Sequence, residues 1–163
     1  STINGVRVGN IYLPNGNPAP GPKFEYKIAW MARLYDRAIE LLATEMPVVL
    51  GGDYNVIPLD IDCYDPAGWV GDALTHDYSR AAFFKILHAG YLDALRAIHP
   101  AGVHYTYWDY QAGAWQRDNG LRIDHLLFSP EAGDRLTDVG IDRSPRGLEK
   151  PSDHTPIWCS LRD

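Results

Sequence analysis

The chain has few of the residues that mark several classes of protein. Its two cysteines, Cys63 and Cys159, are far apart and outside any Cys-x-x-Cys spacing, so the sequence indicates neither a disulfide framework nor a zinc knuckle. No apolar run approaches the roughly 18 residues that a membrane-spanning helix needs. The chain also does not begin with a charged segment followed by an apolar one. These features favour a cytoplasmic protein with no membrane partner.

An excess of basic charge is also lacking. The 163 residues carry a formal net charge of −6, which argues weakly against binding nucleic acid along an extended basic face. A metal-dependent nuclease can nevertheless be acidic overall, because its carboxylates gather at the site while a few Arg and Lys line the groove. The net charge therefore leaves the nuclease class open.

Length and pattern predict one compact domain over residues 1–163, in which helices cover a sheet. Alternating apolar residues predict a strand over 6–13, and apolar positions three and four apart predict a long helix over 24–45. A short apolar run over 48–53 predicts a buried strand. The other expected elements are helices over 79–88 and 91–99, and strands over 105–110, 122–129, 137–143 and 155–161. The mixture predicts an α/β or α+β fold.

Polar residues follow the predicted strand 48–53 directly. Asp53 and Asn55 are two positions apart, so in extended backbone their side chains face the same way. The preceding Gly51 and Gly52 allow backbone or ligand to approach closely. The alternative is an Asx turn that only closes the strand.

Asp124 lies in an otherwise apolar strand, where an unpaired carboxylate would be costly. Its partner is either an Arg such as Arg122 or the distant His154, because a His that acts as a base needs a carboxylate to fix its tautomer. Asp153 places a metal-competent carboxylate directly before His154, the residue type that titrates near neutrality. The alternative for Asp153 and His154 is a helix cap or a surface pair.

The motifs Gly-Asp-x-Asn, Arg-Ile-Asp and Ser-Asp-His occur in this order, after the run Asn10 to Gly16. Together they resemble the exonuclease III family of AP endonucleases, within the endonuclease/exonuclease/phosphatase superfamily that includes DNase I. The resemblance extends from Val6 to Arg162. It implies a four-layer α-β-β-α sandwich and hydrolysis of DNA phosphodiesters in repair, as a 3′–5′ exonuclease and abasic-site endonuclease.

Five residues match catalytic positions of that family. The resemblance implies that Tyr12 contacts the scissile phosphate and that Asp124 pairs with His154. It also implies that Asp53 and Asn55 handle the water or leaving group and orient the phosphate. How the roles divide between Asp53 and His154 stays open.

The resemblance also implies a bound Mg²⁺ or Mn²⁺, with Asp153, Asp53 and Asn55 among its ligands, because hard oxygen ligands select these ions. The family's metal-binding glutamate, in a Gln-Glu motif, and its early active-site asparagine have no counterpart in the sequence. We therefore expect a fragment, roughly the C-terminal two-thirds of such an enzyme, that is inactive or nearly so alone. Without the N-terminal strands of the sandwich, its uncovered sheet surface should either self-associate or require the missing segment as its cover.

Double-stranded DNA with an abasic site is the expected partner. Tyr107 and Trp108 match aromatic residues that contact the duplex in the family, and such side chains can wedge into a groove; the alternative is packing in the core. Candidate phosphate contacts are Arg117, Arg122 and Lys150. The alternative for each is a solvated surface side chain that contacts no DNA.

Two other functions stay open. One is a phosphatase or phosphodiesterase of the same superfamily that acts on small or lipid phosphates, which the acidic charge favours. The other is a non-catalytic binding or assembly module. The aromatic run over 105–110 and the run over 146–154 favour the DNA-repair branch, and the retained acids with His154 favour catalysis.

Overall fold

A five-stranded mixed sheet forms the centre of the structure, a computed structural model that describes residues 1–163. Its strands, in spatial order, are β1 (Thr2–Ile3), β2 (Val6–Tyr12), β3 (Val48–Asp53), β5 (Asp124–Phe128) and β4 (Leu92–Asp93). Strands β2 and β3 are parallel, whereas β5 runs antiparallel to β3. The end of β3 therefore lies beside the start of β5.

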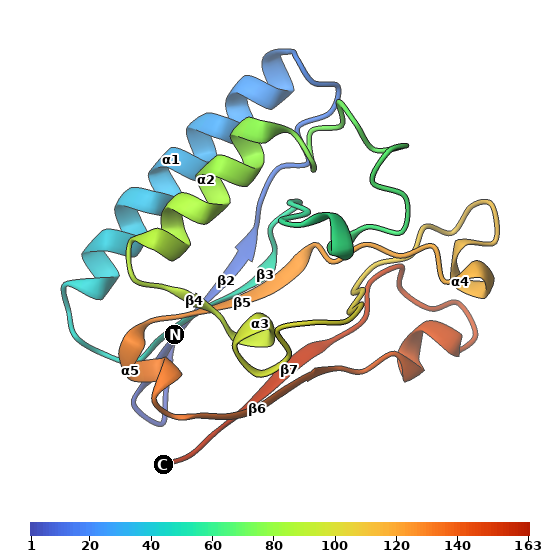
Figure 1. The fold of residues 1–163 in the computed structure, drawn as a ribbon. Coiled ribbons are helices and arrows are strands. Elements are labelled where there is room, and N and C mark those ends of the chain that lie inside the picture. The colour runs from blue at the N-terminus through green and yellow to red at the C-terminus, as the bar shows by residue number, and fades with distance from the viewer.

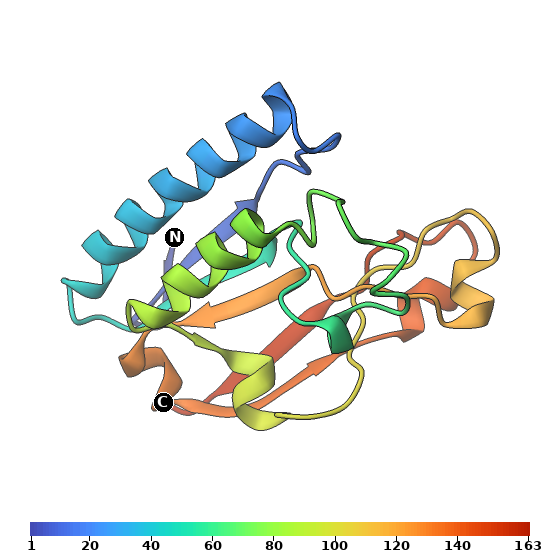
Figure 2. The same cartoon turned by 45° about the horizontal axis from the view of Figure 1, so that its top comes forward.

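Two helices cover one face of this sheet, α1 (Pro22–Leu42) and α2 (Asp77–His88). They lie side by side in both ribbon views (Figures 1 and 2). Helix α1 connects β2 to β3, because parallel strands need a crossover connection. Its buried positions are three and four apart, as an amphipathic helix requires, and they include Met31, Leu34, Ala38 and Leu41.

A second sheet covers the opposite face. It consists of β6 (Leu136–Ile141) and β7 (Ile157–Leu161), which pair antiparallel. The short helices α3 (Ala94–Ile98) and α5 (Pro130–Gly133) pack beside it. The structure thus has a helix layer, a main sheet and a smaller sheet (Figure 2).

Side chains of the central strands alternate between these two layers. Leu50 and Leu127 belong to the core under α1 and α2. Val49, Leu126 and Phe128, their neighbours along the chain, belong to the core against the second sheet. This alternation is what a strand buried on both faces requires.

Most predicted elements are present, but two segments differ. The segment 91–99, predicted to be a helix, begins with β4 because Leu92 and Asp93 pair with β5 before α3 starts. The segment 105–110, predicted to be a strand, makes only isolated bridges at Tyr107, because Tyr105 and Trp108 pack into a small separate core and Tyr110 is exposed. None of the helices combines the length and the apolar character needed to cross a bilayer.

An apolar cavity of about 410 Å³ opens between the main sheet and β7. Val6, Val8, Ile157 and Leu161 are among the side chains that line it. Strand β7 pairs only with β6, so its other edge carries unpaired backbone groups. Trp158 on this strand is 42% exposed. The two sheets therefore leave apolar surface uncovered at this edge.

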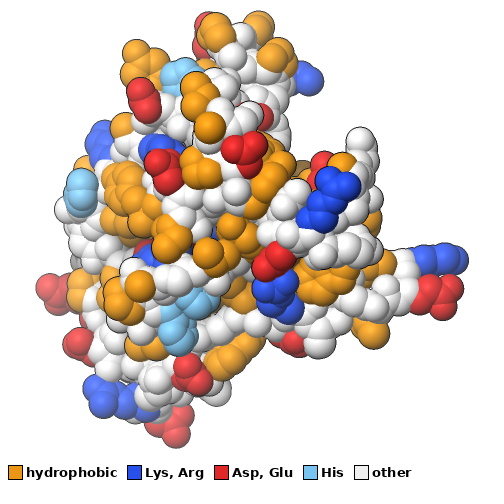
Figure 3. All heavy atoms as spheres, turned by 45° about the vertical axis from the view of Figure 1, so that its right-hand side comes forward, with side chains coloured by type: hydrophobic (Ala, Val, Ile, Leu, Met, Phe, Trp, Pro, Cys, Tyr) orange, Lys and Arg blue, Asp and Glu red, His pale blue; other side chains and the backbone are white.

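Long loops gather at the other end of the molecule from the two termini (Figure 1). They contain the short helices η1 (Asp60–Asp62), α4 (Ala114–Arg117) and η2 (Ser144–Gly147). On the side of the molecule shown in Figure 3, acidic and basic side chains are scattered among hydrophobic ones, without a large region of one charge.

Candidate active site

Three of the predicted site residues lie in register across three adjacent strands. Tyr12 at the end of β2 pairs with Asp53 at the end of β3, and Asp53 pairs with Asp124 at the start of β5. His154 reaches the same place through a backbone bridge to Tyr107. Sequence positions up to 142 apart, from Tyr12 to His154, are thus brought to one end of the sheet.

A hydrogen bond of 2.8 Å joins Nδ1 of His154 to Oδ2 of Asp124. The backbone N–H of Asp124 donates to Oγ1 of Thr106 at 3.1 Å, which holds the start of β5 in place. Because the carboxylate accepts a hydrogen from Nδ1, Nε2 is the ring nitrogen available to another molecule. Of the two partners that the sequence left open for Asp124, His154 is therefore the correct one.

Asp53 and His154 both have shifted pKa values. Burial raises the pKa of Asp53 to about 6, and the nearby carboxylate of Asp124 adds to the rise. Burial acts to lower the pKa of His154, but the hydrogen bond and charge of Asp124, with the charges of Asp53 and Asp153, outweigh it and raise this pKa. The pKa of Asp53 is thus moved toward neutral pH, where a general acid–base group operates.

Asn55 is held against Asp53 by two hydrogen bonds. Its backbone N–H donates to Oδ1 of Asp53 at 2.8 Å and its Nδ2 donates to Oδ2 at 3.0 Å. Nδ2 also donates to the carbonyl of Leu13 at 2.8 Å. Asn55 has a φ of 48°, in the left-handed region that Asn tolerates better than most residues. The Asx turn and the convergence of an acid with an amide, which the sequence offered as alternatives, are both present.

These residues line a pocket of about 240 Å³ at the end of the sheet. The predicted residues that line it are Tyr12, Asp53, Asn55, Tyr107 and His154. Tyr12 is 79% exposed, while the ring of Tyr107 meets that of His154 edge-on with centroids 5.1 Å apart.

The pocket also contains polar and aromatic residues that the sequence analysis missed, Asn15, Asn17, Trp69 and Asp72. Nδ2 of Asn17 donates to both carboxylate oxygens of Asp72, at 3.1 and 3.0 Å. The asparagines lie in a turn-rich stretch just after β2, so their place at a strand end was a usable signal. Nothing in the local sequence marks Trp69 and Asp72, which reach the pocket from the irregular segment 59–77.

Two predicted DNA contacts are wrong. Trp108 is fully buried, its Nε1 donates to Oδ1 of Asp118 at 3.0 Å, and Arg143 stacks on its ring at 4.8 Å. It belongs to the core, the alternative that the sequence had left open. Lys150 and Arg117 are exposed, and their phosphate contacts stay predictions.

Arg122 is the second correction, because its side chain is fully buried and cannot contact a phosphate. Its guanidinium donates to both carboxylate oxygens of Asp62, at 2.7 and 3.0 Å, and to Oδ2 of Asp93 at 2.7 Å. Its Nη1 also lies 3.1 Å from Nδ1 of His125. Nε2 of His125 lies 2.9 Å from the carbonyl of Val56, so this ring links β5 to the loop after Asn55.

The predicted metal ligands do not form a site by themselves. Nowhere in the chain do three His, Cys, Asp or Glu side chains come close enough together to hold a metal ion. Asp53 and Asn55 face the pocket, but Asp153 does not line it. Mg²⁺ is usually held by one or two carboxylates together with substrate phosphate and water, so one carboxylate and one amide are only part of its ligand set. The residues present therefore do not fit a complete Mg²⁺ or Mn²⁺ site.

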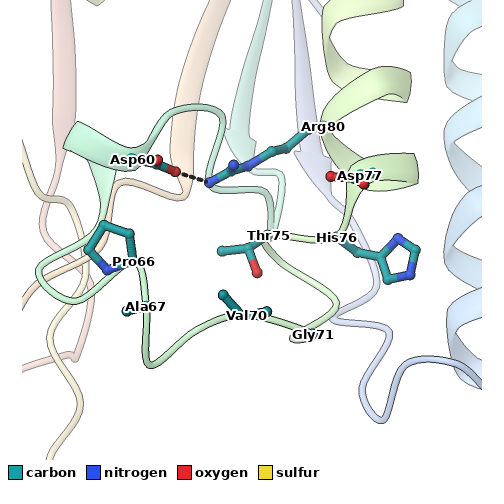
Figure 4. Close-up of a pocket in the computed structure, with 9 residues that line it drawn as sticks. All are labelled: Asp60, Pro66, Ala67, Val70, Gly71, Thr75, His76, Asp77 and Arg80. Carbon is teal, nitrogen blue, oxygen red and sulfur yellow. Dashed lines mark hydrogen bonds and ion pairs between the residues drawn. The ribbon is translucent and has the colours of Figure 1, made fainter.

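A larger cavity, of about 620 Å³, lies on the far side of the loop that carries Trp69 and Asp72. In Figure 4, Arg80 extends from α2 toward Asp60, and the two side chains form an ion pair of 3.0 Å. None of the predicted site residues lines this cavity. The smaller pocket, where the acid, amide and imidazole converge, is therefore the candidate active site.

Comparison with known proteins decides the family. Residues 2–154 match the Endonuclease/Exonuclease/phosphatase family. The chain belongs to this family. One relative is exodeoxyribonuclease III of Haemophilus influenzae. It is 32% identical to this chain over a match that covers 96% of this chain and 62% of the relative. An exodeoxyribonuclease of Bacillus subtilis is 33% identical over 93% of the chain and 58% of its own length.

Solved structures of the family agree with the predicted fold. A 3′ phosphatase, NExo, from Neisseria, bound to a product DNA hairpin, superimposes with a TM-score of 0.95 at 41% identity over 99% of this chain. An AP endonuclease from Archaeoglobus fulgidus gives 0.93 at 37% identity over 98%. These matches confirm the DNase I-like α/β fold. The chain spans 63% of the length of each of these two proteins.

Proposed function

We propose that this chain supplies the Asp53, Asp124 and His154 centre of an exodeoxyribonuclease III-like enzyme of DNA repair. Such an enzyme hydrolyses phosphodiesters at 3′ ends and at abasic sites in double-stranded DNA. The observation that carries the proposal is the 2.8 Å hydrogen bond between Asp124 and His154, together with the fact that His154 lines the same pocket as Asp53. Relatives named as exodeoxyribonucleases and AP endonucleases support it.

The roles of the pocket residues follow from their contacts. Asp124 holds His154 so that Nε2 points away from the pair, and in the protonated ring this nitrogen donates to a phosphate oxygen, where negative charge develops during hydrolysis. Asp53 is the acid closest to Asn55, and its carboxylate form accepts a proton from an attacking water. Exposed Tyr12 is placed to contact the phosphate at the mouth of the pocket.

We further propose Mg²⁺ or Mn²⁺ as the ion of the assembled site. Asp53 and Asn55, which line the pocket, would supply some of its oxygen ligands, whereas Asp153, which does not line it, stays a predicted ligand. Because no three ligands of the required kind converge within residues 1–163, the rest would come from the DNA phosphate, from water or from residues outside this sequence.

A direct test uses DNA substrates with and without a supplied partner segment. Purified chain and Mg²⁺ are mixed with a duplex containing an abasic site, or with a DNA hairpin carrying a 3′ phosphate. The reactions are repeated after addition of the segment of Haemophilus influenzae exodeoxyribonuclease III that this chain does not match. We expect little or no hydrolysis by the chain alone and measurable hydrolysis by the mixture.

Matched variants make this test specific. Asp53→Asn and His154→Asn should abolish hydrolysis by the mixture, whereas Asp36→Asn, an equal charge change on the exposed face of α1, should not. Preference for inositol or sphingolipid phosphates over DNA would favour the small-phosphate alternative. DNA binding without hydrolysis in any mixture would favour the non-catalytic module. Turnover by the chain alone at the rate of a full-length relative would contradict the expected inactivity.

A further inference from the structure

Lys27 is a buried lysine that the proposed chemistry does not use directly. It lies on the inner side of α1 and is fully buried. Its Nζ donates to the carbonyls of Asn55, Asn15 and Ala73, at 2.6, 3.0 and 3.2 Å. An ammonium group has three donors, so the hydrogen-bonding capacity of Lys27 is completely used by main-chain oxygens.

The three carbonyls come from three separate loops around the pocket. Asn15 follows β2, Asn55 follows β3, and Ala73 lies between Asp72 and Leu74 in the segment before α2. Asn15, Asn55 and Asp72 each present a side chain to the pocket. One side chain therefore sets the positions of the three loops that form this wall.

The first of these loops is fitted closely over the aliphatic stem of Lys27. Gly16 has a φ of 91°, and a Cβ built on it would lie 2.6 Å from Cδ of Lys27. Only glycine permits this approach and this backbone conformation. The loop that carries Asn15 is therefore shaped to this particular side chain.

An apolar side chain would fill the same space without the cost of burying a charge. Burial lowers the pKa of Lys27 to about 8, although the charges of Asp72 and Asp53 oppose the decrease. Buried charges of this kind are weak contributors to stability, because desolvation offsets their favourable contacts. The lysine is therefore explained by its contacts with the three carbonyls at the pocket wall, which an apolar side chain would leave without this donor.

We propose that Lys27 is a positioning residue for the phosphate-ester hydrolysis proposed above, and that it acts by fixing the backbone of the loops that carry Asn15, Asn55 and Asp72. In particular, its shortest bond holds the Asn55 carbonyl while the left-handed φ of Asn55 turns the N–H and side chain toward Asp53. This inference rests on the proposed function of the pocket.

Hydrogen exchange followed by NMR on the chain alone tests the positioning. In Lys27→Met, we expect the Asn55 amide, which donates to Asp53, to exchange at least about tenfold faster, because the loop loses its anchor. The amide of Leu50 in the centre of β3 should keep its exchange rate. Lys23→Met, a change on the exposed side of the same helix, should alter neither amide.

Equal acceleration at Asn55 and Leu50 would reveal a general loss of stability and overturn the proposal, as would unchanged exchange at Asn55. If Lys27→Met does not fold, Lys27→Gln, which retains an amide donor, is measured with the same criteria.

The complemented nuclease assay supplies a kinetic readout. There, Lys27→Met should lower kcat by about tenfold or more with KM nearly unchanged, since small misplacements of positioning groups act on the reaction step. An unchanged kcat would overturn the proposal. If the unmodified mixture hydrolyses no DNA while the exchange result holds, the proposed function fails and the structural role of Lys27 stands.

Discussion

Replacing Asp124 by Asn tests the centre of the proposed site without requiring activity. The amide keeps the shape of the carboxylate but removes its charge, so His154 loses the partner that raises its pKa. Both side chains are mostly buried, at 31% and 14% exposure for His154 and Asp124, so solvent screens their interaction only in part. A hydrogen bond between charged groups contributes roughly 1.5–3 kcal/mol, against about 1 kcal/mol for a neutral one.

The sign of the pH dependence follows from the direction of the pKa shift. A histidine whose pKa is raised by folding stabilises the protein below its unfolded pKa, and this stabilisation is lost as the pH rises through the folded pKa. Asp124→Asn should therefore lower the free energy of unfolding at pH 5.5 by about 1 kcal/mol, the difference between the charged and the neutral hydrogen bond. At a pH above the folded pKa of His154, where the ring is neutral, the loss should be clearly smaller.

Urea unfolding followed by tryptophan fluorescence at the two pH values measures this difference. In parallel, ¹⁵N NMR of the imidazole should show the pKa of His154 decreasing in Asp124→Asn, with hydrogen on Nδ1 of the neutral ring in the unmodified chain. Asp36→Asn controls for the change in net charge. The same loss of stability at both pH values, or an unchanged titration of His154, would refute the pairing.

Further predictions concern the buried network, Asp53 and the uncovered sheet edge. Arg122→Met should cost about 3–5 kcal/mol in urea unfolding, because it removes the ion-pair partner of buried Asp93 and leaves buried Asp62 with Arg96 alone; a loss below about 1 kcal/mol would contradict this role. The ¹³C signal of the Asp53 carboxyl should titrate with a pKa of about 6, and a value near 4 would refute the assigned burial. Light scattering of concentrated chain should give a mass above that of the monomer, and Trp158→Lys on β7 should reduce it; a monomer at high concentration would refute self-association.

The sequence was a good guide to polar residues at strand ends. Asp53, Asn55 and Asp124 stand out because each follows or interrupts an apolar run, and the strand period places them at one end of the sheet. His154 could be added only through its need for a carboxylate, since nothing local links it to a segment thirty residues away. The order of these motifs along the chain carried the resemblance to a known family, and that resemblance grouped them into one site.

Burial of charged and aromatic residues was where the sequence failed. Arg122 looked like a surface cation because its partner Asp62 lies 60 positions away, beyond the reach of any local pattern. Trp108 lies in a segment whose aromatic residues suggested a strand, but tertiary packing buries it with Tyr105 in a separate core. Such long-range packing overrides local preference.

The strand register that aligns Tyr12, Asp53 and Asp124 limits how this pocket could be built into another protein by design. The lateral spacing of these residues is the spacing of neighbouring strands, and it is set by main-chain hydrogen bonds. Sliding β5 by one residue would put His125 opposite Asp53 and point the carboxylate to the other side of the sheet. A designer who copies the pocket therefore needs three adjacent strands with this relative alignment, and grafted loops alone would not reproduce it.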